Sequence, residues 1–218
     1  MFEIKNKNTS VISLGCDCFT RAFTTVTGLK PRKADGELSM PFDLSWSSTE
    51  ALVHNLRTDF KDYFDNIVYD NENGNYMNNK YIMRFNHDTD CENTKEGYEK
   101  LKQRYESRIQ NFRECLKSDN YLLFIYNAPP NTEHECNEIF DIISSKILNQ
   151  NFKLIILDMN EKINKALLND NIALCAIKHP FNRSNEWWLK ENVDKCMEYY
   201  QKCGNAVKKI IAETKQVI

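Results

Sequence analysis

Four short, mostly apolar runs recur along the chain, each followed by polar turn residues and then by a stretch of helical periodicity. The runs are residues 10–14, 121–126, 154–157 and 172–177. Continuous apolar strands separated by helices are typical of a parallel sheet that is covered on both faces. We therefore predict an α/β fold: a layered sandwich with a mostly parallel central sheet and helices on both faces.

The stretches between the runs have apolar residues three and four positions apart, which indicates amphipathic helices. One helix is predicted from about residue 17 to residue 26, and another from Asn93 through about five turns. Thr132 and Glu135 have the spacing of a capping box that opens a third helix. The last helix begins near Val193, and Trp187-Trp188 before it is expected to pack against it.

Residues 28–92 lack this regular pattern. The segment contains scattered prolines and glycines, aromatic clusters and a polar stretch around Gly74, which indicates a hairpin, and a strand is predicted over residues 81–85. A chain of 218 residues fits one domain. We expect a single α/β domain over residues 1–218, with an irregular insertion at about 28–92 that could supply binding residues.

Charge and composition exclude several classes of function. The formal net charge is -2 and the positive residues are scattered, so neither nucleic acid nor an anionic membrane surface is an expected partner. The longest apolar runs are far shorter than the roughly 20 residues of a membrane span. The first residues do not resemble a signal peptide, so we expect a cytoplasmic protein. No phosphate loop, dinucleotide fingerprint or zinc motif is present, and no cofactor or metal is expected.

The eight cysteines are expected to be free thiols in a reducing compartment. Five of them fall inside or beside apolar periodic stretches and are expected to act as small buried hydrophobic residues. These are Cys115, Cys136, Cys175, Cys196 and Cys203.

The other notable thiols lie in Ser-Leu-Gly-Cys-Asp-Cys, residues 13–18, between the first strand and the first helix. Gly15 permits a sharp turn and Asp17 is a good capping residue, so Cys18 is predicted to be the first residue inside the helix. Unpaired backbone N–H groups there stabilise an anion, which predicts a lowered pKa and a nucleophilic Cys18. Cys16 precedes the cap and is less suited, although the pair could also bind a metal or act as a redox switch.

A nucleophilic thiol needs a base within reach. His87 and His179 each follow a predicted strand, and the spacing alone leaves both open as candidates. His54 and His134 are expected at the surface or on a helix boundary.

Several short motifs stand in order along the chain: Ser13-Leu14-Gly15-x-x-Cys18, Pro41-Phe42-Asp43, Phe85-Asn86-His87-Asp88, Tyr105 with Arg108-Ile109, and residues 123–126. Together they resemble a bacterial family of unassigned function that is catalogued as papain-like cysteine peptidases. The resemblance runs from about residue 10 to residue 130. It implies Cys18 as the nucleophile, His87 as its partner, and Asp43 or Asp88 as the acid that orients His87.

The sequence therefore predicts a cysteine-dependent hydrolase, peptidase- or amidase-like, or an acyl transferase, acting on a peptide or small acyl substrate. Gly15, Phe19 and Asn127 are the predicted oxyanion or substrate-binding positions. An esterase-like alternative pairs Cys18 with His179 and uses Asn127 as an oxyanion donor, although Ala176 stands where such enzymes place an acid. A non-catalytic module that binds a ligand or partner is the third possibility.

Overall fold

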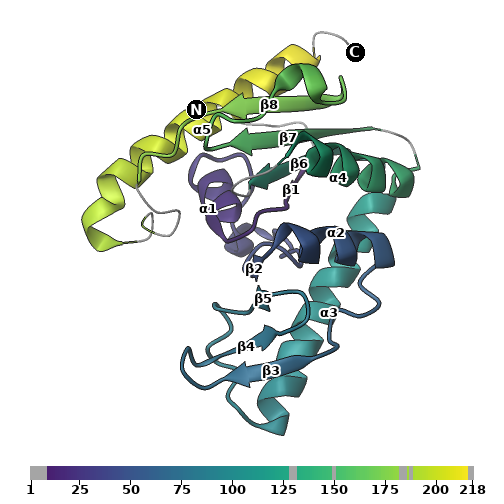
Figure 1. Ribbon diagram of the computed structural model, residues 1–218, viewed down its shortest axis with the longest axis vertical. Coiled ribbons are helices and arrows are strands. Elements are labelled where there is room, and N and C mark those ends of the chain that lie inside the picture. Colours follow the sequence, from purple (N-terminus) through teal and green to yellow (C-terminus); the bar gives the residue numbers. More distant parts are fainter. Residues whose placement is uncertain (1–8, 128–131, 149–150, 182–185, 187–188, 216–218) are drawn as a thin grey trace.

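A parallel sheet of four strands forms the centre of the computed structural model, which describes residues 9–127, 132–148, 151–181, 186 and 189–215 (Figure 1). This sheet, sheet A, has the strand order β1-β6-β7-β8, and each neighbouring pair is parallel. The predicted α/β class is confirmed. The strands are β1 (Thr9–Ser13), β6 (Tyr121–Asn127), β7 (Phe152–Asp158) and β8 (Ile172–Ala176).

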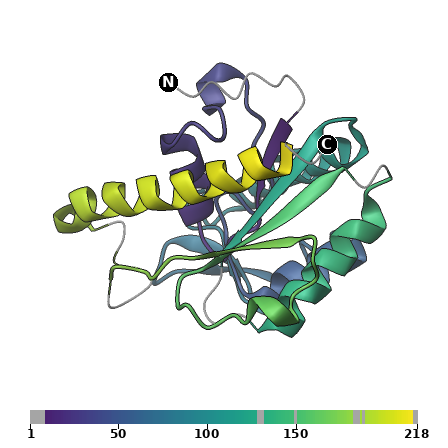
Figure 2. The same cartoon turned by 90° about the horizontal axis from the view of Figure 1, so that it is seen from above.

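Successive residues of these strands face opposite sides, and helices cover each side (Figure 2). Ile12 and Phe124 belong to the core that includes α2, α3 and α4, whereas Val11 and Ile125 belong to the core that includes α1 and α5. The apolar runs are continuous because both faces of the sheet are buried. The helices are α1 (Phe19–Val26), α2 (Thr49–Thr58), α3 (Lys95–Lys117), α4 (Glu133–Lys146) and α5 (Val193–Lys215).

Residues 28–92 are more ordered than the sequence predicted. They contain α2 and a second, antiparallel sheet, sheet B, with the strand order β2-β5-β4-β3. The hairpin at Gly74 is present, with this glycine at φ 64°. The predicted strand over residues 81–85 is reduced to two residues because Ile82 adopts φ 51°, which interrupts extended backbone. The strands are β2 (Trp46–Ser47), β3 (Ile67–Asp70), β4 (Asn75–Asn78) and β5 (Met83–Arg84).

Side-chain caps start α2, α3 and α4. The capping box of Thr132 and Glu135 is confirmed. The N-cap residue of α3 is Thr94, one residue after the predicted start at Asn93, and the Thr94 hydroxyl accepts the Gly97 N–H. Ser48 caps α2 in the same way. Short 3-10 helices cover Lys33–Asp35, Lys165–Leu167 and Lys190–Asn192.

The two sheets share one hydrophobic core. Phe124 of sheet A, Met83 of sheet B and Tyr105 of α3 are fully buried members of the same cluster. Helix α3 runs from the far end of sheet B toward sheet A (Figure 1). It therefore packs against both sheets and holds them together. None of the helices among the described residues is long and apolar enough to cross a membrane.

Candidate active site

Cys18 and His87 meet where sheet A and sheet B adjoin, although 69 residues separate them in sequence. Nε2 of His87 lies 3.1 Å from Sγ of Cys18, within hydrogen-bond distance. Cys18 is half-buried at the start of α1, and His87 is exposed in the loop after β5. The structure thus brings together the thiol and the imidazole that the family resemblance implied.

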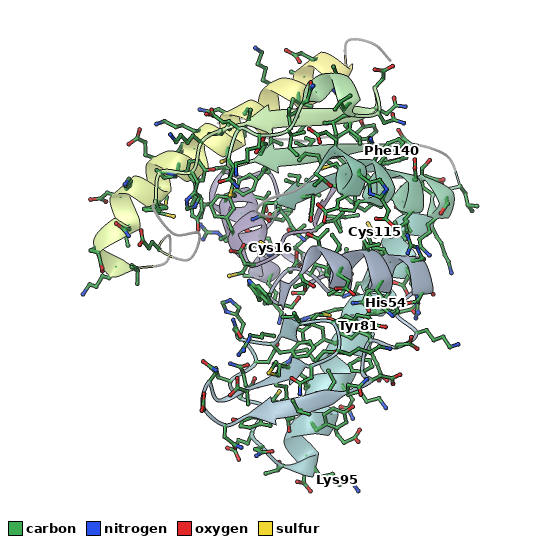
Figure 3. The ribbon with its side chains drawn as sticks, in the orientation of Figure 1. Cys16, His54, Tyr81, Lys95, Cys115 and Phe140 are labelled. Atoms are coloured by element: carbon green, nitrogen blue, oxygen red, sulfur yellow. The ribbon has the colours of Figure 1, made fainter. Side chains whose placement is uncertain are left out.

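A continuous chain of backbone hydrogen bonds positions the two side chains. The Cys16 N–H donates to Asn127 O at the end of β6 (2.8 Å), and Cys16 O accepts the Ser47 N–H of β2 (2.8 Å). Strand β2 pairs in turn with β5, which leads within three residues to His87. Cys16, beside α1 in Figure 3, therefore links the two sheets through its backbone, a role that its side chain does not signal in the sequence.

The turn before α1 differs by one residue from the prediction. Cys18 is the N-cap residue and its side chain caps nothing, whereas Oδ1 of Asp17 accepts the Phe19 N–H (2.9 Å). The N–H of Phe19 is therefore occupied. Its ring is buried against Tyr199 and Tyr200, so Phe19 acts as a core residue rather than as an oxyanion donor.

The prediction of a lowered Cys18 pKa is wrong. Burial, followed by the nearby negative charge of Asp17, raises the pKa of the Cys18 thiol from an ordinary 9.0 to about 12, against a smaller lowering by a backbone hydrogen bond. Burial outweighs the positive end of α1, and Asp17 both adds a negative charge and accepts the first N–H group of the helix. The resting thiol is therefore protonated, and its S–H can donate to Nε2 of His87.

Gly15 and Asn127 brace the loop that carries Cys18. A Cβ atom on Gly15 would lie 2.1 Å from Oδ1 of Asn127 and 2.9 Å from the backbone oxygen of Asp17. Oδ1 of Asn127 accepts the hydroxyl of Thr20, and its Nδ2 is directed at Oδ1 of Asp17 (3.4 Å). Glycine is required here by this close approach and not by a left-handed backbone. Asn127 makes these hydrogen bonds within the loop, whereas the sequence suggested an oxyanion donor.

Replacing Gly15 with alanine is expected to destabilise the protein by about 1–3 kcal/mol, because the added methyl group overlaps the Asn127 side chain. Urea unfolding measures the loss. In the double variant Gly15→Ala with Asn127→Ala the overlap with Oδ1 is gone, so the combined loss should be smaller than the sum of the two single losses. Simple additivity of the two losses would contradict this account.

The two acids that the resemblance implied as orienting groups contact other partners. Both oxygens of the buried Asp43 carboxylate bind Nζ of the buried Lys30 (3.1 and 3.2 Å), and one also accepts the Met40 N–H. The Asp88 carboxylate binds side chains of α3. Within the described part of the chain, neither carboxylate contacts His87, whose hydrogen-bonding contact is Cys18. Among the described residues, neither predicted acid joins the cysteine–histidine pair as a third member.

The other histidines lie in different surroundings. Nδ1 of His179 is 3.5 Å from the backbone oxygen of Phe181, its ring packs edge-on against Phe181 and Tyr199, and burial lowers its pKa. His54 stacks on Tyr81 and lies 3.4 Å from Asp62 (Figure 3). Neither is within hydrogen-bond distance of Cys18, so His87 is favoured over His179 as the base.

All eight cysteines are free thiols, as the sequence predicted. Cys136, Cys175, Cys196 and Cys203 are buried, and Cys115 is half-buried. Among the described residues, no three or more histidine, cysteine, aspartate or glutamate side chains are placed so that they could hold a metal ion. Trp187 and Trp188 lie outside the described residues.

Comparison with known proteins adds no identification: no protein-family model, curated protein or solved structure matches the chain.

Proposed function

We propose that this protein is a cysteine-dependent acyl hydrolase or acyl transferase, of the peptidase or amidase type, in which Cys18 is the nucleophile and His87 the base. The observation that carries the proposal is the 3.1 Å separation of Cys18 Sγ and His87 Nε2. This is the separation that nucleophile–base pairs use for proton transfer. The family resemblance, which pairs the same two residues, supports the assignment.

The raised thiol pKa determines how the first step proceeds. Because Cys18 is protonated at rest, its sulfur bonds to the acyl carbon while the S–H proton passes to Nε2 of His87. The tetrahedral adduct then expels the leaving group, which takes the proton from the imidazolium. The acyl group remains on sulfur as a thioester.

The second step releases the acyl group. Water, or another acceptor nucleophile, attacks the thioester carbon and gives its proton to His87. The sulfur leaves and recovers that proton from the imidazolium. Because Asp17 occupies the Phe19 N–H, we assign the N–H of Cys18 itself as the oxyanion donor.

An activated ester tests this proposal without knowledge of the natural substrate. With p-nitrophenyl acetate, we expect a stoichiometric burst of p-nitrophenol and one acetyl group on Cys18, detected by intact mass and peptide mapping. A digestion at acidic pH that cleaves before Asp17 separates the Cys16 and Cys18 peptides and preserves the thioester. The matched control is Cys16→Ala, which should retain the burst. Acetylation distributed over other residues, or none at all, would favour the non-catalytic binding module.

A further inference from the structure

Two anchored residues bracket His87 in the loop after β5. The N–H of Phe85 donates to Tyr76 O (3.0 Å), and the Phe85 ring is fully buried against Tyr105 of α3, with ring centroids 4.7 Å apart. The N–H of Asp88 donates back to Phe85 O (3.1 Å) and closes a tight turn. Asn86 and His87, between the two anchors, are exposed. The placement of the imidazole therefore depends on how firmly the turn is held.

The carboxylate of Asp88 fastens this turn to α3. It is 2% exposed, and its two oxygens accept hydrogen bonds from the Tyr105 hydroxyl (2.9 Å) and from the guanidinium of Arg104. Arg108 adds a third contact, with Nη2 3.7 Å from Oδ1. On the other side of the turn, Asp88 O accepts the Cys91 N–H (2.9 Å). Asp88 is thus bound to α3 by its side chain and to the loop by its backbone.

Hydrogen-bond geometry and charge both favour a rigid connection between the Phe85–Asp88 turn and α3. A buried carboxylate that accepts charge-assisted hydrogen bonds is costly to release from its partners. Arg104 is itself held by Asp90, through bonds of 2.9 and 2.8 Å, and these pairings raise the pKa of the Arg104 guanidinium. His87, by contrast, has Cys18 as its hydrogen-bonding contact within the described residues. Its backbone is fixed by the anchored turn, and no carboxylate of the described residues contacts its ring.

We propose that Asp88, Tyr105 and Arg104 are positioning residues for His87, acting through the backbone of the Phe85–Asp88 turn rather than by contact with the imidazole. This inference rests on the proposed function of the Cys18–His87 pair. The sequence suggested an acid that binds His87 directly; the contacts instead assign Asp88 to the link with α3. Because proton transfer requires the base within hydrogen-bond reach, loosening the link should slow acyl transfer without altering the thiol itself.

A double-variant cycle tests the proposal, with the rate of acetyl transfer from p-nitrophenyl acetate to Cys18 as the readout. Asp88→Asn and Tyr105→Phe are each expected to slow acylation about tenfold in the otherwise unchanged protein. In a His87→Ala background, neither should slow it further, because the residue through which they act is gone. Asp59→Asn is the matched control: Asp59 binds Arg113 of the same helix, away from the turn and from Arg104, and its replacement should leave the rate within about twofold.

The outcomes separate failure of the positioning inference from failure of the proposed function. If Asp88→Asn or Tyr105→Phe slows acylation equally with and without His87, their effect does not pass through His87 and the inference is overturned. It is also overturned if neither has an effect in the otherwise unchanged protein. If His87→Ala alone leaves the rate unchanged, the proposed function fails instead. Should Asp88→Asn not fold, Tyr105→Phe, which removes a single hydroxyl, carries the test.

Discussion

Alkylation of Cys18 by iodoacetamide is expected to accelerate about tenfold per pH unit from neutral pH to about pH 9, with no plateau. The reacting species is the thiolate, and burial together with the charge of Asp17 raises the pKa of Cys18 to about 12. Throughout this range the thiol is mostly protonated, so each unit of pH multiplies the small thiolate fraction by ten. Peptide mapping after timed quenching, in a Cys16→Ala background, gives the rate for Cys18 alone.

Asp17→Asn is the matched control for this experiment. It removes the negative charge but keeps a side-chain oxygen that can accept the Phe19 N–H. Lowering the pKa of Cys18 in this way should speed alkylation at neutral pH several-fold, while the rate still rises with pH. A Cys18 rate that is fast and independent of pH over this range would instead reveal a preformed thiolate, and would contradict the protonated resting state.

The central sheet and the long helices could be predicted because their patterns are long. The run at residues 121–126 became the seven-residue β6, and the stripe that follows Asn93 became the 23-residue α3. Sheet B could not be predicted as such, because β2 and β5 have two residues each and so show no alternation. β2 is also hydrogen-bonded to the backbone of Cys16, which is distant in sequence.

The candidate site, like the fold, could be predicted only in part. Short motifs in the correct order singled out Cys18 and His87, but partner choice between buried charges is a tertiary property. From the sequence alone, Asp43 could have oriented His87. In the structure Asp43 pairs with Lys30 instead, and nothing in the sequence links Asp43 to Lys30. The sign of the Cys18 pKa shift was missed for a similar reason. Here burial of the thiol and the neighbouring Asp17 carboxylate outweigh the stabilisation that a helix start gives a thiolate.

Arg104 and Ser47 were missed altogether. Arg104 lies on α3 directly before Tyr105, where a charged residue is ordinarily solvated, and the sequence carries no sign that it binds Asp88. Ser47 acts through its backbone N–H, which every residue except proline possesses. Residues that position a site through backbone geometry therefore escape motif analysis, even where the reacting side chains do not.

Replacing His87 with alanine is expected to slow acetyl transfer to Cys18 by about 100-fold, the lower end of what general-base assistance contributes. The expected loss is large because, with the thiol protonated, attack on the acyl carbon requires an acceptor for its proton, and Nε2 of His87 is the group 3.1 Å away. His87 is exposed, so the fold should be unaffected and the melting temperature unchanged. Stopped-flow measurement of p-nitrophenol release gives both rates.

His179→Ala is the matched control, since it removes the other imidazole that follows a strand. It should leave the acylation rate near that of the unchanged protein, because burial and packing against Phe181 and Tyr199 hold this ring in a different environment. Added imidazole should partly restore the rate of the His87→Ala variant, because the vacated position beside Cys18 is open to solvent. The reverse result, in which His179→Ala slows acylation and His87→Ala does not, would assign the role of base to His179. It would also favour the esterase-like arrangement over the pair formed across the two sheets.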